Sequence, residues 1–470
     1  MKPTLKDTLL FIAIYFINWF ATIAQVPLAL SDLQNEAVEW LQEYIRINTI
    51  NPPGNEIAGA EFLAGIFKAE GIEYEIAESS PGRGNIWAML EGGDEPGLVL
   101  LHHIDVVPAD KKFWITDPLS GELKDGYIYG RGALDTKSSG ILHLAAFIAL
   151  HRSGITLKRN ILFMATADEE AGGFYGAGWL VKNRPELFKD VGYLLNEGGG
   201  GTELNGQVQF GIEVTQKVPY WLRLSVTGVA GHGSRPLVSY ASIELIAALE
   251  RLRLHEFIPR IIPVVDTYFK GIADSHPEPW SSHFKDISSL IGSPEIDKEL
   301  QAYSPSLHAL TRNTCSITRF QGSSKINVIS SEAWAELDCR LLPDQDPEEW
   351  LTEVKQVLGE NVEVEVLMGF TPAISTKETD LYRILEEVTL EGFPDSSILP
   401  RLQGGFTDSH FFRDLGIVCY GYVPTATPKE DQGGVHGNNE RITEQNFRQG
   451  VELTIKILER FAANKKVLKD

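Results

Sequence analysis

Imidazole and carboxylate side chains recur in this 470-residue chain where an apolar run ends or a glycine-rich turn begins. These two ligand types, without thiolates, suit a catalytic zinc or a similar divalent ion that keeps one coordination position open. Taken alone, each residue also has an ordinary interpretation, such as a hydrogen-bonded surface histidine or a helix N-cap. The predicted metal ligands are His103 in LVLLHHIDVV, Asp135 in YGRGALDTK, Glu170 in DEEAGG, Glu197 in NEGG and His436 in VHGNNE.

Asp105 follows His103 by two residues at the end of one apolar run. Residues i and i+2 of a strand point to the same face of its sheet. His103 can therefore bind an ion while Asp105 holds the imidazole from behind, as outer carboxylates do at many metal sites. We predict that Asp105 orients His103.

Three consecutive acids, Asp168, Glu169 and Glu170, follow the apolar run ILFMATA. Their mutual repulsion favours a cation or a catalytic role at this place. With Glu170 assigned to an ion, Glu169 is free to take a proton from a water molecule whose pKa divalent ions have lowered. The sequence therefore predicts Glu169 as a general base.

Two apolar runs of strand length carry these residues, GLVLLHHIDVV and ILFMATADEE. A helical pattern, SSGILHLAAFIALHRSG, lies between them, and GYLLNEGG predicts a third short strand. The order strand, helix, strand is typical of an α/β fold with a mostly parallel sheet. Because parallel strands end at the same edge of a sheet, we expect the candidate ligands to converge there.

The pattern changes at about Val218. The segments YWLRLSVTGVAG, AWAELDCRLL and NVEVEVLM alternate polar and apolar residues as antiparallel strands do, and SIELIAALERLRLH and DPEEWLTEVKQVL predict helices. We therefore predict an α+β lid domain inserted into the α/β catalytic domain. The predicted boundaries are 1–30 for an N-terminal segment, 31–217 and 369–470 for the two parts of the catalytic domain, and 218–368 for the lid.

A long stretch within the lid, between Glu256 and Thr314, is rich in proline and serine and carries no assigned elements. Its aromatic and apolar residues could form a pocket for a lipophilic acyl group, or they could pack the domain's own core. These residues are Phe257, Ile261, Tyr268, Phe269 and Trp280.

The N-terminal segment contains an uncharged apolar run, residues 9–30, that follows Lys2 and Lys6. A basic start followed by an apolar run is typical of an export signal or a membrane anchor, and the run is about long enough to span a bilayer. A buried N-terminal helix is the alternative. We expect an exported protein that is periplasmic, secreted or membrane-anchored.

Charge and cysteine content exclude some classes. The formal net charge of −22 repels a phosphate backbone, so we expect no nucleic-acid partner. Only Cys315, Cys339 and Cys419 occur, without C-x-x-C spacing, so neither a disulfide framework nor a thiolate zinc site is predicted. We expect three ordinary buried thiols.

The same motifs, in the same order, make residues 35–460 resemble the co-catalytic zinc peptidases and amidohydrolases that include carboxypeptidase G, aminoacylase, acetylornithine deacetylase, succinyl-diaminopimelate desuccinylase and carboxypeptidase S. The resemblance implies that His103 is a ligand and that Asp135 bridges two ions. It places Glu170 on one ion and Glu197 on the other, with His436 opposite Glu197. One departure is Asn196, where the aminoacylase and carboxypeptidase S branch often has aspartate.

The resemblance also extends to the predicted lid and to a glycine-rich loop. His232 in GHGSRP resembles a histidine that stabilises the oxyanion, in many relatives across a dimer. Arg340 in LDCRLLPD resembles an arginine that grips the substrate's free carboxylate, which a guanidinium can bind with two hydrogen bonds. The remaining residues implied to contact substrate are Asn327 in KINVIS and, in GGFTDSHFF, the loop from Gly404 and Gly405 to Asp408.

The function implied is a dinuclear-metal hydrolase that cleaves a peptide or N-acyl amide bond next to a free carboxylate. The expected cofactors are two divalent ions, zinc first, with cobalt or manganese possible. The length of the 256–314 stretch resembles the carboxypeptidase S and N-fatty-acyl amino acid hydrolase branch, and a homodimer through the lid is expected. An aminopeptidase or dipeptidase, and a non-catalytic binding protein on the same fold, remain as alternatives.

Overall fold

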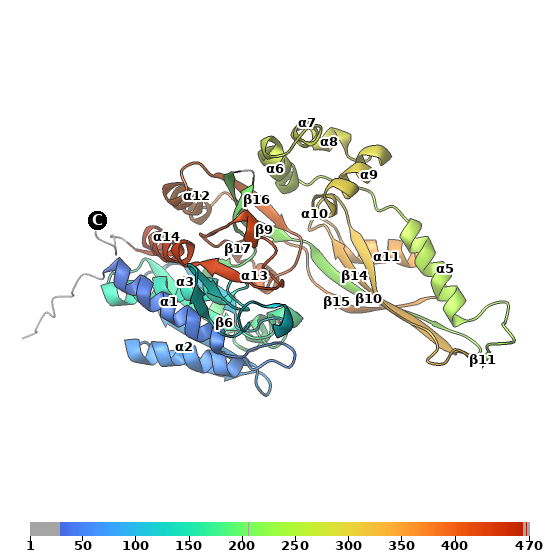
Figure 1. Ribbon diagram of the computed structural model, residues 1–470, viewed down its shortest axis with the longest axis horizontal. Coiled ribbons are helices and arrows are strands. Elements are labelled where there is room, and N and C mark those ends of the chain that lie inside the picture. Colours follow the sequence, from blue (N-terminus) through green and yellow to red (C-terminus); the bar gives the residue numbers. More distant parts are fainter. Residues whose placement is uncertain (1–28, 205, 464–466, 468–470) are drawn as a thin grey trace, which may run out of the picture.

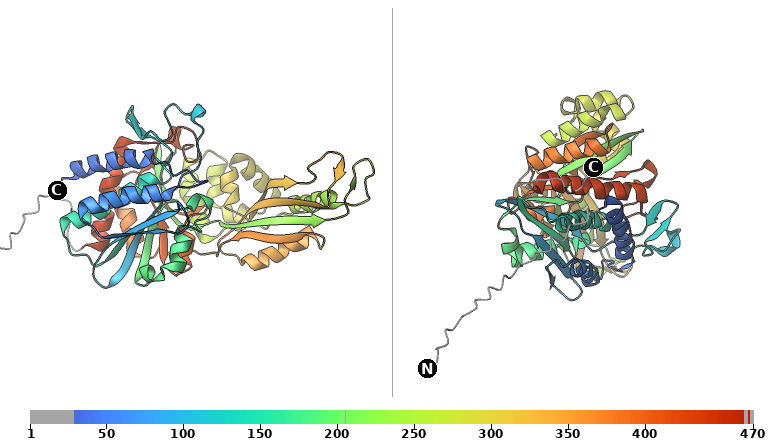
Figure 2. Two further views of the ribbon diagram at one scale, coloured as in Figure 1. Left: turned by 90° about the horizontal axis from the view of Figure 1, so that it is seen from below. Right: turned by 90° about the vertical axis from the view of Figure 1, so that its left-hand side faces the viewer.

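The computed structural model describes residues 29–204, 206–463 and 467. Two parts lie along the long axis, a body of helices around a large sheet and a narrower lid (Figures 1 and 2). The chain runs through the body, out into the lid and back into the body (Figure 1). This arrangement, with a mostly parallel central sheet and separate antiparallel sheets, confirms the predicted fold class.

The body is built on a ten-stranded sheet of order β1-β2-β6-β3-β7-β17-β9-β8-β18, with β16 pairing β9. The neighbours β6, β3, β7 and β17 are parallel, as are β16 with β9 and β18 with β8. The strands are β1 (Tyr74–Glu78), β2 (Gly84–Leu90), β3 (Glu95–His103), β6 (Arg159–Thr166), β7 (Val191–Asn196), β8 (Gly200–Leu204), β9 (Gln207–Gln216), β16 (Ser397–Gln403), β17 (Val418–Gly421) and β18 (Ala426–Thr427).

Helices cover both faces of this sheet, which is why its central strands are apolar throughout. In β3, Leu98 and Leu100 pack in the larger core, whereas Val99 and Leu101 pack in a smaller core on the opposite face. The larger core contains residues of α1 (Leu30–Arg46), α2 (Glu56–Glu70), α3 (Lys137–Ser153), α12 (Asp380–Gly392) and α14 (Glu444–Ala462). The smaller core contains residues of α4 (Ala177–Asn183) and α13 (Ser409–Arg413), and a separate small sheet joins β4 (Glu122–Lys124), β5 (Tyr127–Tyr129) and β19 (Arg441–Thr443).

The lid is a four-stranded antiparallel sheet of order β12-β14-β10-β15. Along β14, Ala333, Ala335 and Leu337 are buried in a core with the helices, while the residues between them lie on the other face. The elements are β10 (Val218–Thr227), β12 (Thr314–Gln321), β14 (Glu332–Leu341), β15 (Glu363–Gly369), α5 (Ala241–Leu254), α11 (Pro347–Leu358) and, in a two-stranded sheet of their own, β11 (Gly231–His232) and β13 (Val328–Ile329).

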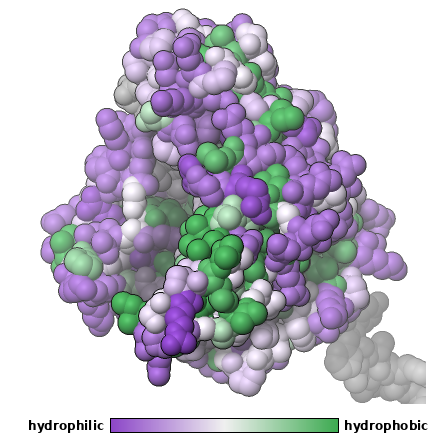
Figure 3. All heavy atoms as spheres, turned by 90° about the vertical axis from the view of Figure 1, so that its right-hand side faces the viewer, coloured by the Kyte–Doolittle hydropathy of each residue, from purple (hydrophilic) through white to green (hydrophobic). Residues whose placement is uncertain are grey.

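Apolar side chains interrupt the mostly hydrophilic surface on the lid side of the molecule (Figure 3). The lid residues Val238 and Ile326 are fully exposed, and Ile246 of α5 and Phe320 of β12 are about half exposed. Exposed apolar residues in one region are typical of a contact surface.

The unassigned stretch between Glu256 and Thr314 forms helices that pack in a hydrophobic core separate from the other cores. Phe269 and Trp280 are buried in this core, and Phe257 packs beside Trp350 in the lid, so the core interpretation of these aromatics is correct. The helices are α6 (Pro263–Ile272), α7 (Trp280–Lys285), α8 (Ile287–Leu290), α9 (Pro294–Tyr303) and α10 (Pro305–Ala309). Sequence periodicity misses them because most are very short.

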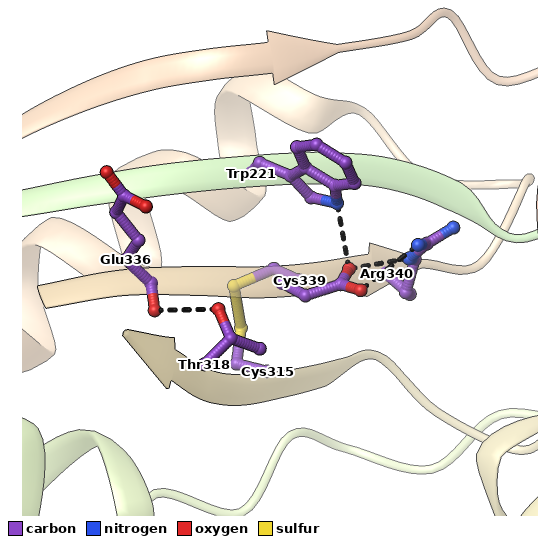
Figure 4. The surroundings of a disulfide bond; sticks show 7 residues. Trp221, Cys315, Thr318, Glu336, Cys339 and Arg340 are labelled. Carbon is purple, nitrogen blue, oxygen red and sulfur yellow. Dashed lines mark hydrogen bonds and ion pairs between the residues drawn. A yellow bond between two sulfur atoms is a disulfide. The ribbon is translucent and has the colours of Figure 1, made fainter. Parts of the chain in front are cut away.

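The cysteine prediction is wrong for two of the three residues. Cys315 and Cys339 form a disulfide that joins β12 to β14 (Figure 4), and only Cys419 is a free, buried thiol. The two cysteines stand directly opposite each other in the antiparallel pair, with 4.0 Å between their Cα atoms. Such a pairing depends on strand register, which the cysteine spacing does not reveal.

Residues 1–28, which hold most of the predicted export signal or anchor, lie outside the described residues. The last part of the apolar run is described, because α1 begins at Leu30. Among the described residues, every helix is too short or too polar to span a bilayer.

Candidate active site

Three neighbouring parallel strands bring the candidate residues to one edge of the body sheet. In the order β6-β3-β7, β3 ends at His103, β6 is followed by the acids 168–170, and β7 is followed by Glu197. Asp135 lies in the turn before α3, and His436 lies in the loop before β19. The expected convergence at the carboxyl ends of the strands is therefore observed.

Asp135 lies between two groups of possible ligand atoms. In one group its Oδ1 is 3.1 Å from His103 Nε2, which is 3.6 Å from Glu197 Oε1. In the other group its Oδ2 is 3.1 Å from His436 Nε2, which is 3.2 Å from Glu170 Oε2. Within each group the ligand atoms lie within 4.8 Å of one another. One carboxylate thus presents one oxygen to each group.

The electrostatics of these groups are unfavourable for carboxylates without a cation. Burial raises the pKa of Glu197 well above its usual value, and burial together with the charge of Glu197 does the same to Glu169. Burial opposes a charge on His103, but Glu197 and hydrogen bonds to Asp105 and Asp135 outweigh it and raise the His103 pKa. Protons or metal ions are needed to hold so many acids together.

The residues present fit divalent metal ions. Each group offers imidazole and carboxylate, the ligand types of a catalytic zinc site. Glu170 Oε1 is buried and has no hydrogen-bond partner among the described residues. Hydrogen bonds to Asp135 and Glu170 raise the pKa of His436 to about 10, so a cation would displace a proton from this imidazole.

Glu169 belongs to neither group, although it lies beside them. Its Oε2 is 3.9 Å from His103 Nε2, and its side chain is buried. Its carboxylate thus lies beside the ligand groups without belonging to either. This position is compatible with the proton transfer that the sequence predicts for Glu169.

Asp105 mainly holds the backbone of the acidic loop. Its carboxylate accepts hydrogen bonds from the N–H groups of Glu169 and Glu170, at 3.2 and 3.1 Å, and from Asn51 Nδ2 at 2.8 Å. The nearest partner of His103 Nδ1 is the backbone carbonyl of Asp105, at 2.9 Å, whereas the carboxylate is 3.5 Å away. Asp105 thus links the His103 strand to the loop of Glu169.

Glu440 is a buried residue that sequence reasoning missed. Its Oε1 accepts hydrogen bonds from the backbone N–H groups of Gly132, Leu134 and Asp135, and its Oε2 pairs with Arg131 at 2.7 Å. Arg131 also donates to the carbonyl of Gly437, beside His436. Glu440 and Arg131 therefore tie the turn of Asp135 to the loop of His436. Both lie inside the recognised motifs, but more than 300 residues separate them, so spacing does not reveal the pair.

A second missed network lies behind Asp105. Arg83 donates to Asn51 Oδ1 at 3.1 Å and to Glu56 Oε1 at 2.5 Å, and its Nη1 is 3.5 Å from Asp168. Asn51 in turn donates to Asp105. These residues come from four loops and the start of a helix, and only the fold brings them together.

His232 and Asn327 lie together, but at the far end of the lid (Figure 1). The N–H of Gly233 donates to the carbonyl of Asn327, and the exposed ring of His232 contacts Ser234. Among the described residues, no hydrogen bond or ion pair joins either of them to the metal-ligand groups. A single chain does not bring these two predicted residues into its own site.

Arg340 lies at the base of the lid, near the body. Its Cζ is 5.4 Å from the ring centre of Phe406, which follows Gly404 and Gly405 in the glycine-rich loop. At the end of this loop, Asp408 is buried and accepts a hydrogen bond from Thr166 Oγ1 at 3.0 Å. Burial raises the Asp408 pKa to about 7. The arginine and the loop thus face the junction between lid and body.

Comparisons with known proteins give a consistent result. A family model described as peptidase family M20/M25/M40 matches residues 99–460. The N-fatty-acyl-amino acid synthase/hydrolase PM20D1 of Xenopus tropicalis is 31% identical over 451 residues, which cover 91% of this chain and 86% of that protein. Aminoacylase-1 of Sus scrofa is 29% identical, covering 92% of this chain and 96% of that protein.

Solved structures share the fold. The M20 family metallo-carboxypeptidase Sso-CP2 of Sulfolobus solfataricus superposes with a TM-score of 0.69 at 21% identity, covering 92% of this chain and 99% of that chain. Human carnosine dipeptidase 1 superposes with a TM-score of 0.63 at 19% identity, covering 92% of this chain and 98% of that chain. At these identities the likeness concerns the fold alone.

Proposed function

Because the chain belongs to peptidase family M20/M25/M40, and is therefore a metallopeptidase or amidohydrolase, we propose that it is a dinuclear-metal hydrolase of amide bonds next to a free carboxylate. The observation that carries the proposal is the position of Asp135. Its two carboxylate oxygens point to two separate sets of imidazole and carboxylate ligands.

Each set would hold one ion. His103 and Glu197 would bind the first, Glu170 and His436 would bind the second, and Asp135 would bridge both. When bound, two divalent ions lower the pKa of water and polarise the scissile carbonyl. Zinc suits this donor set best, and cobalt and manganese are the alternatives.

Glu169 performs the proton transfers. In a buried position beside the ligand groups, its carboxylate takes a proton from the attacking water and then gives it to the leaving amine. The N–H groups of Glu169 and Glu170 are fixed by Asp105, which keeps the base in place. Pre-positioned groups lower the barrier because little reorganisation remains to be done.

The position of Arg340 supports the proposal that the substrate carries a free carboxylate beside the scissile bond. The arginine faces the junction of lid and body next to the loop of Gly404, Gly405 and Asp408. The relatives named for acyl-amino acids point to the same substrate class. We therefore favour N-acyl amino acids, with carboxypeptidase substrates second. An aminopeptidase would need a group that binds a free amine instead.

The proposal includes a homodimer and an exported location. His232 and Asn327 lie at the exposed tip of the lid, so they would act in the site of a second chain. Exposed apolar side chains on the lid would form part of the contact. The Cys315–Cys339 disulfide is consistent with an oxidising compartment, as is the apolar run at residues 9–30, which would be a cleaved signal or an anchor.

The test is a matched substrate screen on the zinc-loaded protein. One amino acid is offered as the N-acetyl compound, the N-fatty-acyl compound, the C-terminal residue of a dipeptide, and the N-acetyl compound with its carboxylate amidated. We expect release of the amino acid from the first two and a much lower rate with the amidated compound. Faster hydrolysis of substrates with a free amine would favour the aminopeptidase, and no turnover in any metal would favour a binding protein.

A further inference from the structure

We infer that Asp338, assisted by Trp221, is a positioning residue that fixes the Arg340 guanidinium with one edge free for the substrate's carboxylate. The inference rests on the proposed function, because it assumes that Arg340 meets this carboxylate. It adds the residues that decide where the carboxylate can bind. Asp338 stands in the LDCRLLPD segment of Arg340, but the resemblance assigns it no role, and neither residue is a ligand or a proton-transfer group.

Asp338 and Arg340 stand two residues apart on β14, on the face opposite the helices. Arg340 Nε donates to Asp338 Oδ1 at 2.6 Å, and Nη2 donates to Oδ2 at 3.0 Å. This pair occupies one side of the guanidinium plane with two parallel hydrogen bonds. A carboxylate held this way restricts the arginine far more than a single contact does.

The remaining donors of Arg340 are those of its outer edge. A guanidinium has five N–H donors, and the pair with Asp338 uses the one on Nε and one on Nη2. Nη1 is buried and has no hydrogen-bond partner among the described residues. Buried donors are normally satisfied, so the free Nη1 is a place for an acceptor from outside the chain. With Nη2, it forms a second edge that suits a carboxylate.

Asp338 is itself held from a second strand. Trp221 Nε1 on β10 donates to Asp338 Oδ1 at 2.9 Å. Cys339, between the two paired residues, joins β14 to β12 through the disulfide on the opposite face (Figure 4). The aspartate side chain is therefore held from β10, and the strand that carries it is tied to β12 at the next residue. The arginine alone would be free to turn about its long side chain.

The guanidinium of Arg340 lies beside the glycine-rich loop of the body. The guanidinium carbon lies 5.4 Å from the ring centre of Phe406, two residues before the buried Asp408. Under the proposed function, this loop lines the substrate pocket. Asp338 thus determines which edge of the Arg340 guanidinium is free to bind the substrate's carboxylate. The position of that edge sets where the carboxylate lies relative to the scissile bond.

The experiment uses the zinc-loaded full chain and a matched pair of substrates, an N-acyl amino acid and its carboxamide. We expect Asp338→Asn to raise KM for the free acid at least tenfold with little change in kcat, and to leave kcat/KM for the carboxamide unchanged. Trp221→Phe should raise KM for the acid in the same way but less. Glu332→Gln, an exposed carboxylate on the same strand, is the control and should match the wild type.

The outcomes separate this inference from the proposed function. If kcat/KM for the acid equals kcat/KM for the carboxamide in the wild type as well as in Arg340→Met, the proposed carboxylate contact is wrong. If Arg340→Met loses the preference for the acid while Asp338→Asn and Trp221→Phe keep it, Asp338 does not position Arg340. A lower KM for the acid in Asp338→Asn would mean that Asp338 competes with the substrate, which also overturns the inference. Unchanged carboxamide turnover shows that a variant is folded. If Asp338→Asn does not fold, Trp221→Phe tests the inference in its place.

Discussion

At the scale of single residues, the site is a set of acids that are costly to hold together without cations. Burial and mutual repulsion raise the pKa of Glu169 and Glu197, and Glu170 keeps one buried oxygen without a partner among the described residues. Removing a ligand and removing the base should therefore have different consequences.

Replacing Glu169 by glutamine should abolish proton transfer and leave the ligands intact. We expect turnover to fall by about 10²- to 10⁴-fold, the usual contribution of a general base, while zinc content stays near that of the wild type. Metal analysis and steady-state kinetics on the same preparation measure both. His103→Ala is the contrast, because it should lose metal as well as activity. Near-normal turnover of Glu169→Gln with full metal content would remove Glu169 from the mechanism.

Glu440 should control metal affinity without contacting the metal. Glu440→Gln removes the charge that pairs with Arg131 and replaces one of the two oxygens by an NH₂ group, so the side chain can no longer accept from both Arg131 and the three N–H groups around Asp135. We expect zinc affinity to fall roughly 10- to 100-fold, as for other residues that orient ligands. Competition with a chelator measures it. Glu444→Gln is the control, since Glu444 pairs with Arg448 nearer the surface, and equal affinity in the two variants would contradict the role of Glu440.

At the scale of elements, the strand ends of the body hold the proposed ligands, and the lid sheet holds Arg340, the proposed carboxylate contact. Strands β6, β3 and β7 bring their terminal residues together because they are parallel neighbours. In the lid, β14 presents Asp338 and Arg340 on one face and Cys339 on the other, as the period of two requires. The disulfide at Cys339 then joins β14 to the edge strand β12.

Removing the disulfide should destabilise the lid. The bond joins residues 24 apart, and closing a loop of that length stabilises a fold by about 3 kcal/mol through the entropy of the unfolded chain. We expect the double variant Cys315→Ser, Cys339→Ser to unfold at a lower urea concentration than the wild type. Its free energy of unfolding should be lower by roughly that amount. Adding a reductant should shift the wild type to the same midpoint and leave the double variant unchanged. A wild type that is insensitive to reductant would contradict the stabilising role.

At the scale of the whole molecule, the helices α6–α10 bridge the lid and the body. Their core includes Leu342 from the end of the lid strand and Leu402 from β16 of the body. Lys217, the residue between β9 and β10, donates to the carbonyls of Ala309 and Arg312. The bridge connects the two parts of one chain, whereas His232 lies at the far tip of the lid, where the proposed function has it act in a second chain.

Mixing two inactive variants tests the site shared between chains. Glu169→Gln keeps His232, and His232→Ala keeps Glu169, so a mixed dimer contains one intact site if His232 acts in the partner. We expect each variant alone to be weakly active, the mixture to regain activity, and the solution mass to be about twice that of one chain. An active monomer by light scattering, or a mixture no better than its components, would contradict the arrangement.

The sequence by itself determined the fold class and the ligand types, because alternation along strands, helical periodicity and short motifs are local properties that survive in one dimension. Only the tertiary structure decided what depends on register and distant pairing. Glu440 meets the turn of Asp135 across most of the chain, Cys315 meets Cys339 because β12 and β14 align in one register, and Asp338 meets Trp221 from the neighbouring strand. These contacts arise when separate elements pack, and no spacing in the chain encodes which side chains then face each other.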